Sequence, residues 1–178
     1  VRCKNCKFIY LNPRVNSKIV ANSYKKNSDN EFVKYNKFRL KTFSVNLKRV
    51  LKIINFKNKV SFKILDVGSG GGTFLLAAKR LGFNAEGIEP NKWLVRFIKN
   101  KNKLKIRQGT LETLKFNYKF NFICFWDVFE HVTDLNLTLK ICKKILNKNG
   151  ILLINVPDHG SIFRKILGFK WPFFLNVH

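Results

Sequence analysis

The sequence contains no methionine and only ten acidic residues, against 35 lysines and arginines. It lacks an apolar run long enough to cross a bilayer, and no basic-then-apolar signal segment opens the chain. These absences predict a cytoplasmic protein without a membrane span. The missing methionine, together with a cysteine pair beside the first residue, predicts that the 178 residues are an internal part of a longer protein.

The composition predicts one main globular domain. Hydrophobic residues make up 46% of the chain and 18 residues are phenylalanine, which is enough to bury one substantial core. The net charge of +25 is compatible with a nucleic-acid partner or with an acidic small-molecule substrate, such as a nucleotide-linked sugar. The lysines are spread along the chain and form no basic arm, so a nucleic-acid-binding module is the weaker alternative. The sequence leaves the oligomeric state open.

The few acidic residues are informative because of this basic excess. Half of them lie at or just beyond the end of a predicted strand: Asp66, Glu89, Glu112, Asp127 and Asp158. In an open α/β sheet, ligands bind at the carboxyl ends of the strands. We therefore expect these side chains to surround a binding site.

Strands and helices are predicted to alternate through the main domain, residues 59–178. Apolar runs predict strands at Lys63–Val67, Ala85–Ile88, Lys105–Arg107, Phe122–Trp126 and Ile151–Val156. Helical spacing predicts helices at Thr73–Leu81, Lys92–Asn100 and Leu135–Leu146. This alternation is typical of a doubly wound α/β domain with a mostly parallel sheet. Residues 15–58 are predicted to form a helical N-terminal linker or cap.

The most specific motif is the glycine-rich turn Asp66–Thr73. A buried strand, a tight glycine turn and a helix start form the unit on which nucleotide-like cofactors bind, because glycine accepts positive φ and lets a ligand approach closely. A dinucleotide fingerprint has glycine where Thr73 stands, so an NAD-type oxidoreductase remains only as an alternative. Asp66, two residues before the first glycine, suits a cofactor with a cationic end.

Glu89 is predicted to end the second strand, 21 positions beyond Gly68. An acid at about this distance can accept hydrogen bonds from both hydroxyls of an adenosine ribose. The alternative is an ordinary exposed glutamate before Pro90. Because the spacing occurs together with Asp66 and the glycine turn, the binding role is the favoured interpretation.

Two segments resemble the class I S-adenosylmethionine-dependent methyltransferases. The turn Asp66–Gly72 is similar to the first motif of the family, and Trp126–Val132 is similar to the segment after its fourth strand. The resemblance implies a Rossmann-like methyltransferase fold, here ending before the last strands of the family. It also implies S-adenosylmethionine as the cofactor and methyl transfer to a small-molecule acceptor.

The resemblance assigns the methionyl end of the cofactor to the glycine turn. Gly68, Gly70 and Gly71 would admit the methionyl backbone. Asp66 would hold its ammonium group by a charge-assisted hydrogen bond, and Asp127 would lie at its outer end.

The remaining roles concern the ribose, the adenine and the methyl group. The resemblance places Glu89 on the ribose, and Thr110 with Leu111 on the adenine. Trp126 would stabilise the sulfonium by cation–π attraction, or would be plain core. His131 is a candidate general base, since an imidazole titrates near neutrality; the alternative is that it only shapes the pocket.

Cys3 and Cys6 have the spacing of half a zinc site, which needs four ligands. The pair resembles the second half of the zinc ribbon that precedes one branch of these methyltransferases. This implies a ribbon remnant over residues 1–14, with zinc bound in the full-length protein; two free thiols are the alternative. The same branch resembles proteins of cell-surface polysaccharide modification, which implies a sugar or polysaccharide intermediate as the acceptor.

Overall fold

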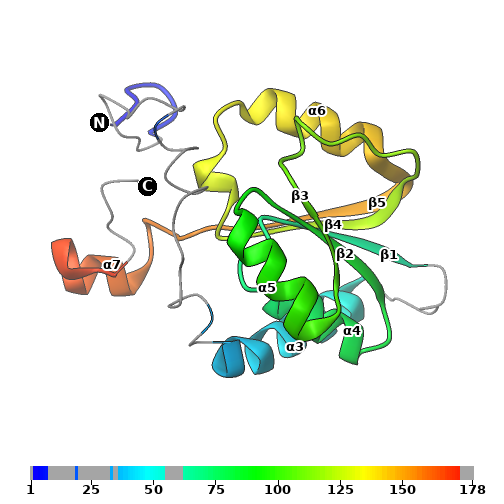
Figure 1. Cartoon of the computed structure of the whole chain (residues 1–178). Coiled ribbons are helices and arrows are strands. Elements are labelled where there is room, and N and C mark those ends of the chain that lie inside the picture. The colour runs from blue at the N-terminus through cyan, green and yellow to red at the C-terminus, as the bar shows by residue number, and fades with distance from the viewer. Residues whose placement is uncertain (1, 8–18, 20–32, 34–35, 55–61, 173–178) are drawn as a thin grey trace.

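The computed structural model describes residues 2–7, 19, 33, 36–54 and 62–172. Its centre is a five-stranded sheet in the order β3-β2-β1-β4-β5, in which every pair of neighbours is parallel (Figure 1). The elements in chain order are α3 (Asn36–Ile53), β1 (Lys63–Val67), α4 (Thr73–Arg80), β2 (Asn84–Glu89), α5 (Lys92–Asn102), β3 (Lys105–Gln108), β4 (Phe120–Trp126), η1 (Phe129–His131), α6 (Leu135–Ile145), β5 (Leu146–Asn155), α7 (Ile162–Leu167) and η2 (Gly168–Lys170).

Helices cover both faces of this sheet. Helices α3, α4 and α5 lie on one face and α6 lies on the other (Figure 1). On the α3 face, Leu47 belongs to one buried cluster with Phe74 of α4 and Phe122 of β4. On the α6 face, Ile145 clusters with Ile123 of β4. Because both faces are buried, the central strands are almost continuously apolar, as expected for a parallel sheet.

The predicted doubly wound α/β fold is confirmed, and β1 has the predicted bounds. The clearest error concerns β5, which begins at Leu146 rather than at Ile151. The pairing of β5 with β4 shifts register between Phe120 and Phe122. The additional residues at the start of β5 lie at this irregularity. A Cβ at Gly150 would lie 2.7 Å from the Leu146 side chain, so the glycine permits this close folding. The Asn149–Gly150 pair therefore lies inside β5.

The predicted helical cap is represented by α3, which packs on α4 and the sheet. Most of the rest of residues 15–58 lies outside the described residues. Helix α7 was not predicted from the sequence pattern. None of the helices in the described part of the chain combines the length and apolarity that crossing a bilayer requires.

Candidate cofactor site

The glycine turn between β1 and α4 is held in a conformation that requires glycine. Gly68, Gly70 and Gly72 have φ values of 70°, 50° and 75°. The amide of Gly68 donates to the carbonyl of Ile88 at 2.9 Å, which ties the turn to the end of β2. A Cβ at Gly68 would lie 2.6 Å from Cγ2 of Val128, so the segment after β4 closes over the turn. The turn is therefore fixed between the ends of three strands.

Replacing Gly68 by alanine is expected to lower the free energy of unfolding by about 2–3 kcal/mol, because the positive φ and the contact with Val128 both oppose a Cβ. Gly82→Ala is the matched control: its φ is also positive, at 84°, but a Cβ there would meet nothing within 4 Å. Chemical denaturation of both variants measures the difference. Equal losses would mean that Val128 does not constrain the turn.

Glu89, the last residue of β2, is buried and holds the glycine turn in place. Its Oε2 accepts from the amide of Gly70 and its Oε1 from the amide of Asn91, both at 2.9 Å. Burial raises the pKa of the Glu89 carboxyl, and the two amides oppose this shift. Each carboxylate oxygen has two lone pairs, so acceptor capacity remains for a ligand. Glu89 therefore lies beside the turn and also stabilises it, a role that the sequence did not reveal.

Asp66, the carboxylate before the glycine turn, is only 2% exposed. Burial raises its pKa to about 7, and hydrogen bonds from Ser69 and Cys124 oppose the shift. The Cys124 thiol lies 3.6 Å from Oδ1 of Asp66, and burial in turn raises the pKa of that thiol. A carboxylate that ionises near neutrality in an apolar setting is poised to gain a cationic partner.

Asp127 follows β4 in a left-handed conformation, with φ of 55°, which a short polar side chain tolerates better than most. Its amide donates to the carbonyl of Asn155 at 3.0 Å. Its Oδ2 accepts from Nη2 of Arg39, at 3.1 Å, and the guanidinium of Arg39 also lies over the ring of Phe43. Arg39 was missed in the sequence because no local pattern connects residues 88 positions apart.

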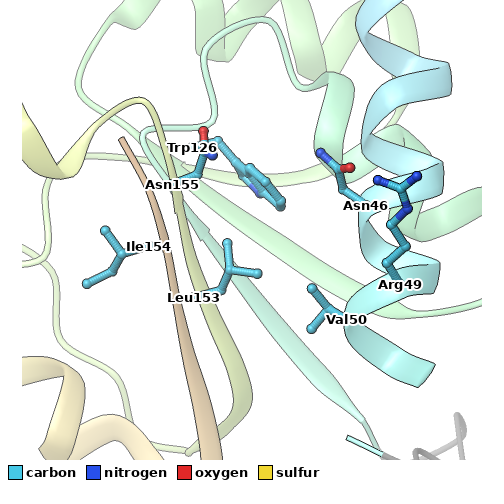
Figure 2. Close-up of a pocket in the computed structure, with 7 residues that line it drawn as sticks. All are labelled: Asn46, Arg49, Val50, Trp126, Leu153, Ile154 and Asn155. Carbon is cyan, nitrogen blue, oxygen red and sulfur yellow. The ribbon is translucent and has the colours of Figure 1, made fainter. Parts of the chain in front are cut away.

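Trp126 lies in an aromatic cluster with Phe43 of α3 and Phe74 of α4. Its ring centroid is 5.1 Å from that of Phe43 and 5.4 Å from that of Phe74. These contacts support the interpretation of Trp126 as core. Figure 2 shows the ring at one wall of a shallow groove of about 270 Å³ between α3 and the ends of β4 and β5. The groove is lined by Asn46, Arg49, Val50, Trp126, Leu153, Ile154 and Asn155.

The three remaining predicted residues lie after β3 and after β4. Thr110 is partly exposed in the turn after β3, and its amide donates to the Thr113 hydroxyl at 2.9 Å. Leu111 is 3% exposed and belongs to the core on the α6 face, so its side chain is largely buried by protein. His131 is half-buried at the end of η1. Their ligand contacts remain predictions.

The cysteine pair lies at the N-terminus. Backbone hydrogen bonds, first from Cys6 and then from Asn5, lower the pKa of the Cys3 thiol, which favours a metal-binding thiolate. Among the described residues, no group of three His, Cys, Asp or Glu side chains could hold a metal ion. The zinc ribbon therefore stays a prediction.

The assembled residues fit S-adenosylmethionine by their chemistry. Asp66, Glu89 and Asp127 stand at the carboxyl ends of β1, β2 and β4 around one glycine turn. The strand order makes these three strands neighbours on the sheet. Carboxylates suit an ammonium group and ribose hydroxyls, and the glycines keep the backbone free of Cβ atoms.

Comparisons with known proteins agree with this fit. Residues 35–178 match the family described as Methyltransferase domain. The chain is 34% identical over 126 residues to a ubiquinone biosynthesis O-methyltransferase of Pelagibacter ubique, covering 67% of this chain and 52% of that protein. It is 30% identical over 103 residues to the Bradyrhizobium diazoefficiens protein of the same description, covering 55% and 41%. The chain thus spans about half the length of the curated relatives it matches.

The fold is also found among solved structures. A SAM-dependent methyltransferase from Archaeoglobus fulgidus aligns with a TM-score of 0.58 and 24% identity, covering 78% of this chain and 63% of that one. At this identity the likeness concerns the fold alone. The family match, which covers well over half of the chain, carries the assignment. The chain belongs to the methyltransferase-domain family, in the class whose cofactor is S-adenosylmethionine.

Proposed function

We propose that the protein transfers a methyl group from S-adenosylmethionine to a hydroxyl oxygen of a small-molecule acceptor. The observation that carries this proposal is the convergence of Asp66, Glu89 and Asp127 on the turn that begins at Gly68. Three carboxylates around one glycine-rich turn match a ligand with an ammonium group and a ribose. Because the chain has only ten acidic residues, three of them around one turn form a concentration that a random spread of acids would not give.

Each residue has a binding or positioning task in this proposal. Asp66 holds the ammonium group in its ionised form, and the free lone pairs of Glu89 accept from the ribose hydroxyls. Gly70 and Gly71 admit the methionyl backbone, while Thr110 and Leu111 border the adenine. Arg39 pairs with Asp127 and offsets its charge. With the cofactor bound, Arg39 can pair with the methionyl carboxylate instead of with Asp127. The cofactor supplies a methyl group that is already activated on a sulfonium, so alignment of the acceptor is the main task of the protein.

The acceptor atom is proposed to be oxygen because the curated relatives are O-methyltransferases of ubiquinone biosynthesis. His131, in the segment after β4, is the proposed base that takes the hydroxyl proton. A sugar hydroxyl, implied by the resemblance to polysaccharide-linked proteins, is the alternative acceptor. Both kinds of acceptor offer a hydroxyl oxygen to the methyl group, so they differ only in the groups that surround this oxygen.

Isothermal titration of the full-length protein with S-adenosylhomocysteine, NAD and an oligonucleotide tests the cofactor. We expect saturable binding of S-adenosylhomocysteine alone. Absence of that binding, or preference for NAD, would overturn the proposal. Transfer of labelled methyl groups to phenols and to hexoses then tests the acceptor. Transfer to hexoses alone would replace the acceptor class and leave the cofactor assignment intact.

A further inference from the structure

The segment after β5 exposes an unusual amount of apolar surface. The large side chains of Ile162, Phe163, Ile166 and Phe169 are 71%, 74%, 75% and 87% exposed. They belong to one short stretch formed by α7 and η2. Single exposed apolar residues are ordinary, but a contiguous group of this kind indicates an interaction surface.

The polar side chains of the same stretch are basic. Between Gly160 and Trp171 there are three lysines and arginines and no acidic residue. Lys165 and Lys170 are exposed next to the apolar group. On a helical projection Ile162, Phe163 and Ile166 share one side, and Lys165 flanks it. Apolar residues on one side with flanking lysines are typical of helices that lie in the interface of a membrane.

Local contacts order both ends of the exposed stretch. The Ser161 hydroxyl accepts from the amide of Arg164 at 3.3 Å and caps the start of α7. After η2, the Trp171 ring is 9% exposed and meets the ring of His159 edge-on at 6.5 Å. The stretch lies beyond the end of β5 and away from the helical layers (Figure 1), and its large apolar side chains are exposed.

We propose that α7 and η2 form a docking surface for an anionic lipid bilayer. Phe163, Ile166 and Phe169 would enter the interfacial region, while Lys165 and Lys170 would meet anionic headgroups. The net charge of +25 complements such a surface electrostatically, which a neutral protein partner would not require. The docking surface follows the carboxyl end of β5, at the same edge of the sheet as the proposed site. If the proposed function holds, docking therefore brings the edge of the sheet that carries the proposed site to the bilayer.

Co-sedimentation of the full-length protein with vesicles tests the docking surface. We expect binding to equal mixtures of phosphatidylcholine and phosphatidylglycerol, and little binding to phosphatidylcholine alone. Binding should weaken as salt is raised, because screening reduces the headgroup attraction. Failure to bind the mixed vesicles would overturn the proposal.

Variants of the exposed side chains make the test specific. Phe163→Ser and Ile166→Ser are each expected to weaken vesicle binding roughly tenfold, and Lys165→Glu by a similar factor that shrinks at high salt. Phe38→Ser is the matched control, since Phe38 is 80% exposed on α3. It should leave vesicle binding unchanged. A loss of equal size in Phe38→Ser would mean that general surface apolarity, and not this stretch, binds the lipid.

Two further measurements separate this proposal from others. The variants should bind S-adenosylhomocysteine as the parent protein does, so a failure of docking and a failure of the proposed function are distinguishable. Light scattering reports whether the exposed residues instead join two copies of the chain. If Phe163→Ser splits an oligomer and leaves vesicle binding unchanged, the stretch is a self-association surface and the lipid proposal is wrong.

Discussion

Replacing Glu89 by alanine is expected to weaken S-adenosylhomocysteine binding roughly a hundredfold. The variant loses the proposed acceptor of the ribose hydroxyls. It also frees the amides of Gly70 and Asn91, which Glu89 holds at 2.9 Å, and so loosens the turn that is proposed to admit the methionyl backbone. Bonds to a charged group contribute about 1.5–3 kcal/mol each, so the loss of the two proposed ribose bonds, at the lower end of this range, accounts for this factor. Isothermal titration at fixed pH measures it.

Glu86→Ala is the matched control for this prediction. Glu86 lies on the same strand and its carboxylate also has two partners, Arg107 at 3.2 Å and Tyr118 at 2.6 Å. These partners lie on β3 and on the segment before β4, not on the glycine turn. The control should lose some stability and keep its affinity. If Glu89→Ala retains full affinity, or if both variants lose affinity equally, the ribose assignment is wrong.

The affinity for S-adenosylhomocysteine is also expected to fall about tenfold for each pH unit below 7. Burial raises the pKa of Asp66 from 3.8 to about 7, so below pH 7 the carboxyl is mostly protonated in the free protein. In the proposed site the ammonium group binds the ionised form of Asp66, so binding must then release the proton. Titrations at pH 6 in buffers of different ionisation enthalpy should detect the release of close to one proton.

The same shift acts on stability with the opposite sign from that of a salt-bridged acid. Between pH 3.8 and about 7 the folded state holds a proton at Asp66 that the unfolded state has lost. The contribution of Asp66 to the free energy of unfolding therefore decreases as pH rises through this window, by a total on the order of 4 kcal/mol. Ligand binding above pH 7 should restore part of it.

Asp66→Asn provides the direct test. This variant should lose affinity by a factor of about 30 at pH 8, together with the pH dependence and the proton release. Asp134→Asn is the control, because Asp134 is exposed at the start of α6 and asparagine keeps its capping ability. A pH dependence that survives in Asp66→Asn would assign the titration to another group.

Most of the fold could be predicted from sequence because its signals are local. The run Lys63–Val67, the glycine turn and the helix start at Thr73 follow one another directly, and each has its own periodicity or turn chemistry. The start of β5 could not be predicted, because it depends on the irregular pairing with β4. Which residues of two strands pair depends on the folded structure, and no local pattern in the sequence reveals it.

The candidate site was predicted in part. The sequence identified Asp66, Glu89 and Asp127 through their positions at or just beyond the ends of strands. It did not identify Arg39, because the ion pair joins residues far apart in the chain. It also left open whether Trp126 is core, which depends on Phe43 of α3 and Phe74 of α4 arriving at the same place.

The few acidic residues of the chain have defined positions in the fold. By itself the sequence determined that acidic residues are scarce and that half of them lie at or just beyond the ends of strands. It also determined that a glycine turn follows Asp66. Only the tertiary structure decided what environment each acid has: Asp66 is buried against a thiol, Glu89 is bound by two amides, and Asp127 faces Arg39. Strand ends are encoded by neighbouring residues, whereas burial, ionisation and partners arise from segments that meet only in the folded chain.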